Sequence, residues 1–171
     1  MDELLTKIWE TDKKVLFLRE KLPDFQRSDV AIVNCREIYD AVKTGFFKFD
    51  EDGQPKINVC SEFSHDISSL SSLLRHEMVH VYDFKIKRLD LTNNDKTDLI
   101  KSEVRAYSYS GYCDEFIWHK KISFLRKRCL QKAVENSVFY HSVTKNEKVM
   151  LIKTIELVVA NEANLMKDLS K

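Results

Sequence analysis

Apolar residues recur at helical spacing along most of the chain. Over residues 3–22, leucine, isoleucine and valine stand at positions that share one face of a helix, and the pattern stops before Pro23, which predicts one N-terminal helix. Further helices are predicted over residues 35–43, 66–88, 98–118, 122–141 and 144–166, with a polar loop over 90–98. Asp66 is a predicted N-cap, and Thr144 with Glu147 three positions later predicts a capping box for the last helix.

One segment, GFFKFDEDGQPKINVC, departs from the helical pattern. Two short alternating apolar runs flank the turn signal Asp52-Gly53, which predicts a β-hairpin and is the chain's only clear strand signal. Its second strand, Lys56–Cys60, is expected at a sheet edge, where it either pairs with an extended substrate backbone or only completes the sheet. The expected fold class is therefore mainly α with a small β-hairpin or sheet, an α+β arrangement.

Length and charge restrict the function further. The 171 residues suffice for one domain with a real core. The 28 basic and 27 acidic side chains nearly cancel, so no strong overall field indicates a nucleic-acid or an anionic-membrane partner. The basic runs HKK and LRKRC, within residues 119–129, are interpreted as a solvated helix face. No apolar run is long enough for a transmembrane helix, and acids at Asp2, Glu3 and Glu10 argue against a cleavable presequence.

Four cysteines are present: Cys35, Cys60, Cys113 and Cys129. None of them forms a CxxC pair, which argues against a four-cysteine zinc site. They either form two disulfides in an oxidising compartment or stay as buried thiols. The sequence leaves both states and the pairing open.

The segment SLLRHEMVHVYDF, residues 72–84, contains the motif HExxH. On a helix, His76 and His80 lie one turn apart on the same face, so their imidazole nitrogens can bind one metal ion. Glu77 can then accept a proton from a metal-bound water and is the predicted catalytic base. One Zn²⁺ ion is the expected cofactor, because zinc lowers the pKa of a bound water and polarises a substrate carbonyl. The other interpretation is a helix whose two histidines flank a solvated glutamate.

A catalytic zinc needs a third protein ligand and one open position. Glu103 is the expected third ligand, because it lies on the next predicted helix, where small residues near its face allow two helices to approach closely. Asp83 lies on the same stripe as His76 and His80, and is expected to hold an imidazole through its free N–H. The other interpretation of Glu103 is a solvated carboxylate or an ion-pair partner of Arg105.

Two segments together, RHEMVHVYDF and SEVRAYSYSGYC, resemble the mitochondrial inner-membrane metalloproteases of the ATP-twenty-three type. The patterns of that family are HELIHAYD and, after a loop, CSEIRAANLSGDC. The shared residues are His76, Glu77, His80, Tyr82, Asp83, Ser102, Glu103, Arg105, Ala106, Ser110, Gly111 and Cys113. The resemblance extends from about Gly45 to Glu162, includes Cys60 and Cys129, and is slight over the first forty residues.

This resemblance implies a zincin-like metallopeptidase domain over residues 45–171, preceded by a helical extension over 1–44, within a single compact domain. The HExxH helix would pack on a second helix that carries the glutamate ligand. The implied site consists of the zinc ligands His76, His80 and Glu103, the catalytic residue Glu77, and the supporting residues Asp83 and Arg105.

The implied protein is a zinc endopeptidase, peripheral to the mitochondrial inner membrane on its intermembrane-space side. It would process or help to assemble a respiratory-chain or ATP synthase subunit, so its partners would be a protein substrate or subunits of a membrane complex. The alternative is a catalytically silent structural subunit of such a complex, built on the same fold. Lys85 and Lys101 stand where the family has cysteines, which would remove one disulfide if those two cysteines pair with each other.

Overall fold

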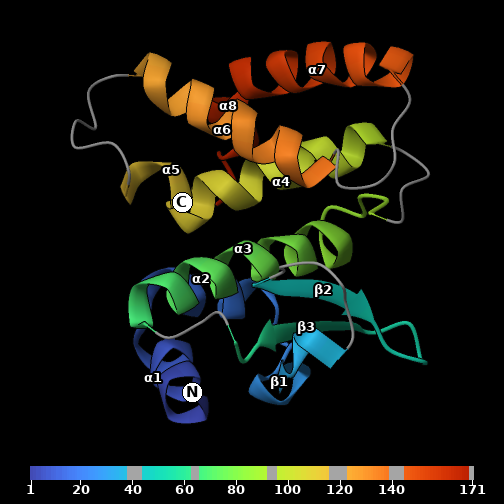
Figure 1. The fold of residues 1–171 in the computed structure, drawn as a ribbon. Coiled ribbons are helices and arrows are strands. Elements are labelled where there is room, and N and C mark those ends of the chain that lie inside the picture. The colour runs from blue at the N-terminus through green and yellow to red at the C-terminus, as the bar shows by residue number, and fades with distance from the viewer. Residues whose placement is uncertain (38–43, 63–65, 92–95, 116–122, 139–144, 170–171) are drawn as a thin grey trace. The chain divides into compact units, whose positions relative to one another are not determined.

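The structure, a computed structural model, describes residues 1–37, 44–62, 66–91, 96–115, 123–138 and 145–169. The chain forms two compact units, Met1–Lys87 and Arg88–Lys171, and each is described by itself. The described residues are mainly helical with a small three-stranded sheet, which confirms the predicted fold class (Figure 1). The division into an extension over 1–44 and a domain over 45–171 stays a prediction.

The first unit begins with two helices, α1 (Asp2–Thr11) and α2 (Lys13–Lys21), where one was predicted. The helices are separated at Asp12, whose backbone is extended and whose side chain accepts hydrogen bonds from the backbone N–H groups of Lys14 and Val15. An aspartate in this role starts a new helix, because it satisfies N–H groups that have no partner in the first turn. The prediction of a continuous helix is therefore wrong at Asp12.

The sheet of the first unit has the strand order β1-β3-β2, from β1 (Val30–Val33), β2 (Gly45–Phe49) and β3 (Pro55–Cys60). Strands β2 and β3 form the predicted antiparallel hairpin, and Gly53 in its turn has a φ of 72°. Strand β1, which was not predicted, pairs with β3 in parallel. Because β3 is paired on both sides, the prediction that Lys56–Cys60 forms a sheet edge is wrong.

Helix α3 (Ile67–Lys85) carries the HExxH motif and packs on α1, α2, β2 and β3. Asp66 caps it as predicted, because its side chain accepts a hydrogen bond from the N–H of Ser69. Its fully buried apolar residues recur at helical spacing: Leu70, Leu74, Met78, Val79 and Val81. Of the helix predicted over 35–43, the structure describes a 3-10 turn, η2 (Cys35–Glu37), and the rest lies outside the described residues.

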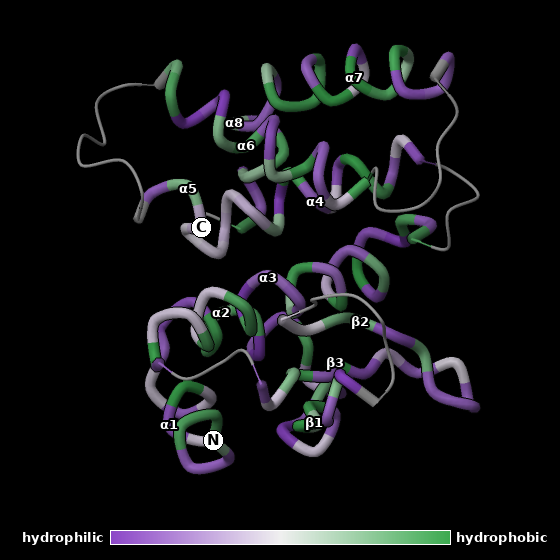
Figure 2. Tube along the Cα trace, in the orientation of Figure 1, coloured by the Kyte–Doolittle hydropathy of each residue, from purple (hydrophilic) through white to green (hydrophobic). Residues whose placement is uncertain are grey.

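The second unit consists of α4 (Lys96–Ser110), α5 (Tyr112–Glu115), α6 (Ser123–Val138), α7 (Lys145–Ala160) and α8 (Glu162–Leu165). Helices α4, α6 and α7 pack on one another, and hydrophobic bands alternate with hydrophilic ones along α6 and α7 (Figure 2). The shared core includes Ile100, Val104, Leu130, Val134 and Ile155. Among the described residues, no helix is long and apolar enough to cross a bilayer.

The helix boundaries of the second unit differ from the predictions in three places. Helix α4 begins at Lys96, inside the predicted loop, and ends at Ser110 because Gly111 adopts a φ of 85°, a backbone conformation that ends helices. Helix α7 ends at Ala160, and the short α8 follows it. Thr144 of the predicted capping box lies outside the described residues.

Both cysteine pairs form disulfides within a unit. Cys35 is bonded to Cys60, which joins η2 to the end of β3, and Cys113 is bonded to Cys129, which joins α5 to α6. The described structure thus contains no free thiol. Disulfides of this kind form and persist in oxidising compartments.

Replacing Cys35 and Cys60 with serine is expected to lower the free energy of unfolding by about 3 kcal/mol, because this disulfide constrains a long loop in the unfolded chain. Its cysteines are 25 positions apart, against 16 for Cys113 and Cys129, so removal of the second disulfide should cost slightly less. Denaturant unfolding followed by circular dichroism, with both variants beside the oxidised protein, measures the two losses. Unchanged midpoints would contradict this expectation.

Candidate metal centre

His76 and His80 project from the same face of α3, one helical turn apart. Their Nε2 atoms are 3.1 Å apart. Two nitrogens bound to one tetrahedral zinc ion at ~2.0–2.1 Å are separated by roughly 3.3 Å. The spacing of the two imidazoles therefore fits two ligands of a single ion.

Aromatic side chains from the hairpin pack beside this pair. The ring centroid of Phe47 on β2 lies 6.5 Å from that of His80 and 4.9 Å from that of Phe49. Phe84, one turn after His80 on α3, has its centroid 4.7 Å from Phe49. An apolar cluster of this kind restricts the imidazole and limits access of water to a metal ion. The hairpin therefore contributes to the site by packing.

Two carboxylates on α3 are buried close to the histidines in sequence. Glu77 is 6% exposed and Asp83 is fully buried. Glutamate and aspartate are rarely buried unless they are paired or bound to a metal ion, so the interpretation of Glu77 as a solvated residue is wrong. The hydrogen bond expected from Asp83 to an imidazole stays a prediction.

An ion pair connects α3 to the N-terminal helices. Arg75, the residue before His76, donates hydrogen bonds from Nε to both carboxylate oxygens of Asp12, at 3.1 and 3.0 Å, and a further one from its Nη2. Burial disfavours the charged form of Asp12, but the hydrogen bonds from Arg75 and from the N–H groups of Val15 and Lys14 outweigh it and lower its pKa. Asp12 thus both starts α2 and anchors α3, the helix that carries HExxH. The sequence contains no signal for this pair, because its members are 63 positions apart.

Asp12→Asn is expected to lower the free energy of unfolding at neutral pH by about 2 kcal/mol, through weaker hydrogen bonds to Arg75 and to the α2 cap. Because the pKa of Asp12 is lower in the folded state, its charge stabilises the fold above about pH 4, and this stabilisation is lost as the pH falls through the folded pKa. Denaturant unfolding at neutral pH and near pH 3 should therefore show a flatter pH dependence in the variant. The exposed Asp24→Asn is the matched control. Equal pH dependence in Asp12→Asn and in the unsubstituted protein would contradict the assignment.

Glu103 lies on α4 in the second unit and is 7% exposed, so the interpretation of it as a solvated carboxylate is wrong. Its Oε1 accepts a hydrogen bond of 2.8 Å from the hydroxyl of Ser137 on α6. This bond orients the carboxylate and is compatible with a metal ion bound through Oε2. Arg105 on the same helix is 5% exposed, and its supporting role stays a prediction. Sequence reasoning missed Ser137, because a lone serine on a distant helix carries no pattern.

The donor atoms match the chemistry of zinc. Two imidazole nitrogens and one carboxylate oxygen are the ligand types found in catalytic zinc sites, where a fourth position stays open for water or substrate. Among the described residues, the two imidazoles come from His76 and His80 on α3 and the carboxylate from Glu103 on α4.

A protein-family model matches most of the chain. The model of the peptidase M76 family, to which metalloproteases of the ATP-twenty-three type belong, matches residues 2–160. The match therefore includes the N-terminal forty residues, where the motifs alone had indicated little resemblance. No curated protein and no solved structure matches the chain. Because the matched residues make up nearly the whole sequence, the chain belongs to the peptidase M76 family.

Proposed function

We propose that the protein is a zinc-dependent endopeptidase that binds one Zn²⁺ ion through His76, His80 and Glu103. The observation that carries this proposal is the pair of imidazole Nε2 atoms 3.1 Å apart on a helix that also buries Glu77. Membership of a metallopeptidase family supports the same chemistry. Zinc is favoured over other ions because two imidazoles and a carboxylate with an open fourth position suit it.

When bound, zinc would supply a water of lowered pKa and would polarise the scissile carbonyl. Glu77 would accept the proton of the attacking water and deliver it to the leaving amine nitrogen, which completes hydrolysis of the peptide bond. Phe47 would hold the imidazole of His80 in place, and Ser137 would hold the carboxylate of Glu103. Asp83 and Arg105 would support the ligands from buried positions.

The proposed location is the intermembrane-space side of the mitochondrial inner membrane, where the enzyme would process or help to assemble a respiratory-chain or ATP synthase subunit. Two disulfides support a compartment that is oxidising. The motifs shared with the ATP-twenty-three type support the substrate class. Partners of this kind are a protein substrate or subunits of a membrane complex.

Elemental mass spectrometry of the protein, purified without chelator, tests the proposal together with an endopeptidase assay. We expect about one zinc ion per chain and cleavage of quenched-fluorescent peptides that stops on removal of the metal by 1,10-phenanthroline and returns with added zinc. Bound zinc with no cleavage of any peptide would favour the silent structural subunit. Protein without zinc would refute the proposal.

A further inference from the structure

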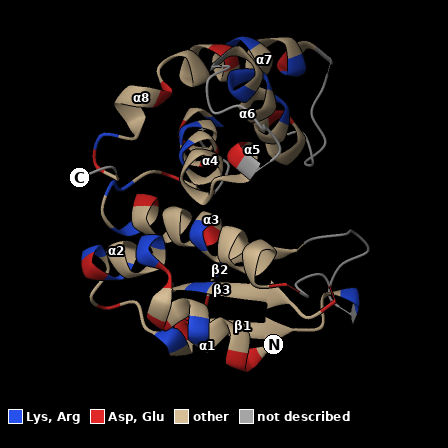
Figure 3. Ribbon diagram, turned by 90° about the vertical axis from the view of Figure 1, so that its left-hand side faces the viewer, with Lys and Arg blue, Asp and Glu red and all other residues tan. Residues whose placement is uncertain are grey.

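Two large apolar side chains are exposed at the start of α6. Phe124 is 66% exposed and Leu125 is 43% exposed. The helix continues with Arg126, Lys127 and Arg128, and no acidic residue occurs among its first ten residues. Lys127 and Arg128 are exposed, so apolar and cationic side chains share one part of the surface. Residues Phe124, Leu125, Lys127 and Arg128 are called the α6 surface below; basic bands on α6 are blue in Figure 3.

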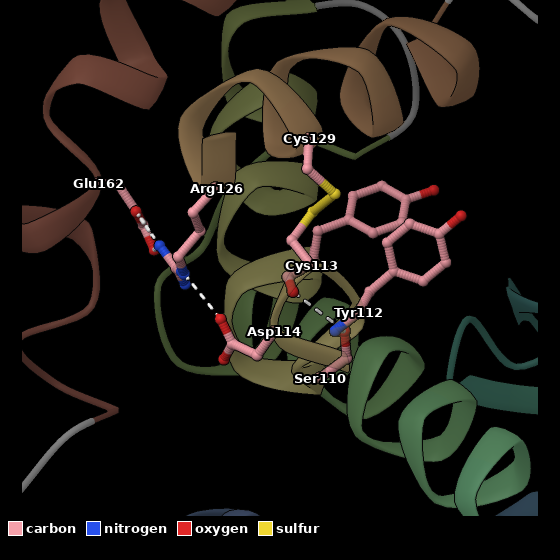
Figure 4. Close-up of a disulfide and its surroundings, with 8 residues drawn as sticks. Ser110, Tyr112, Cys113, Asp114, Arg126, Cys129 and Glu162 are labelled. Atoms are coloured by element: carbon pink, nitrogen blue, oxygen red, sulfur yellow. Dashed lines mark hydrogen bonds and ion pairs between the residues drawn. A yellow bond between two sulfur atoms is a disulfide. The ribbon is translucent and has the colours of Figure 1, made fainter. Parts of the chain in front are cut away.

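Arg126 differs from its two basic neighbours because it is bound within the second unit. Its guanidinium donates a hydrogen bond of 2.9 Å to Asp114 on α5 and one of 2.6 Å to Glu162 on α8. The disulfide between Cys113 and Cys129 also joins α5 to α6, as Figure 4 shows. The α6 surface is thus presented on a helix that is fixed at this end by a covalent bond and two ion pairs.

Helix stability does not account for this charge pattern. The N-terminus of a helix carries a partial positive charge, so acidic residues stabilise its first turn and basic residues disfavour it. Helix α6 has no acidic residue in its first turn and has Arg126 there, followed directly by Lys127 and Arg128. Arg126 is accounted for by its ion pairs with Asp114 and Glu162, while Lys127 and Arg128 gain no stabilisation from the helix dipole. Unlike a face that is only charged, this one also exposes two adjacent apolar side chains, Phe124 and Leu125.

We propose that the α6 surface binds an anionic phospholipid bilayer. Phe124 and Leu125 would insert among the upper acyl chains, while Lys127 and Arg128 bind the lipid phosphates. An apolar pair flanked by cations matches the headgroup layer, which is anionic at its surface and apolar directly beneath. This attachment deepens the proposed location at a membrane. It does not depend on the zinc site, so the two proposals can fail separately.

Flotation of the full chain with vesicles tests the proposal. The probes are vesicles of phosphatidylcholine alone and vesicles in which about one lipid in five is cardiolipin. We expect binding to the cardiolipin vesicles only, weakened as the salt concentration rises. Replacing Lys127 and Arg128 with glutamine should reduce the association constant about 25-fold, and Phe124→Ala should reduce it about tenfold.

The matched control variants remove the same number of positive charges, or one exposed apolar side chain, at other positions on the surface. Replacing Lys13 and Lys153 with glutamine makes the same change in net charge, and Met150→Ala truncates a side chain that is 68% exposed. Each control should change binding by less than about twofold. Circular dichroism and zinc content, measured on every variant, separate loss of the α6 surface from loss of the fold or of the metal site.

Three results would overturn the proposal. The first is equal binding of the protein to both kinds of vesicle, or to neither. The second is equal loss of binding in the α6 variants and in their controls. The third is binding to polyglutamate in place of cardiolipin vesicles, which would assign the α6 surface to an acidic protein.

Discussion

Glu77→Gln is expected to slow peptide hydrolysis by about a thousandfold while leaving the bound zinc in place. The amide has nearly the same shape as the carboxylate but cannot accept the proton of the attacking water. Because Glu77 is buried on α3, between two histidines that are both proposed ligands, the substitution removes a base without removing a ligand. Parallel measurements of kcat and of zinc content test this separation.

The exposed Glu20→Gln on α2 makes the same chemical change away from the site and should leave the rate unchanged. A rate within about tenfold of the unsubstituted enzyme would remove Glu77 from the role of general base. Loss of zinc together with activity would show that Glu77 is needed for metal binding.

Glu103→Gln is expected to weaken zinc binding more than about a hundredfold, since loss of a residue that only orients a ligand already costs about 10–100-fold. The neutral amide is a poorer zinc ligand than a carboxylate. Its NH₂ group donates hydrogen bonds and cannot bind a cation. Ser137→Ala should cause the smaller loss, because it removes the 2.8 Å hydrogen bond to Oε1 and leaves the carboxylate in place. Competition with a fluorescent chelator measures both affinities.

Ser108→Ala is the matched control, because it removes another buried serine hydroxyl from the second unit without changing Glu103. If Glu103→Gln and this control bind zinc equally well, the third ligand is a different residue. If Ser137→Ala weakens binding as much as Glu103→Gln, the orientation of the carboxylate matters as much as its charge.

Local patterns allowed much of the fold to be predicted. Helix α3 and its Asp66 cap follow from apolar periodicity and from one side chain that satisfies a free N–H. The hairpin follows from alternation on both sides of Asp52-Gly53. These signals depend on residues only a few positions apart, so the sequence displays them directly.

The errors in the predicted fold have non-local causes. Strand β1 is four residues long, without polar alternation, and its partner β3 lies 27 positions later, from Val30 to Ile57. A short parallel strand of this kind cannot be distinguished by period from other short apolar runs. Because β1 was not predicted, β3 was expected at the edge of the sheet, although it is the central strand. Asp12 looked like a polar residue on one long helix, because its partner Arg75 lies on a distant one.

The candidate site also contains some residues that a local pattern predicted and others that only the tertiary structure identifies. HExxH predicted the facing imidazoles of His76 and His80, because four positions on a helix bring side chains to one face. Phe47, which packs beside His80, and Ser137, which donates a hydrogen bond to Glu103, come from other elements and depend on tertiary packing. A sequence motif therefore indicates ligands and a base, while the side chains that orient them can be identified only in the structure.

The pairing of the cysteines has a consequence for how the chain reaches its folded state. Four cysteines allow three connectivities, of which one is native. Both members of the pair Cys35–Cys60 precede both members of Cys113–Cys129 along the chain. If the chain enters an oxidising compartment from its N-terminus, Cys35 and Cys60 can react before any later thiol has arrived. When this first disulfide forms before Cys113 enters, Cys129 is the one partner left for Cys113, and the two wrong connectivities do not arise.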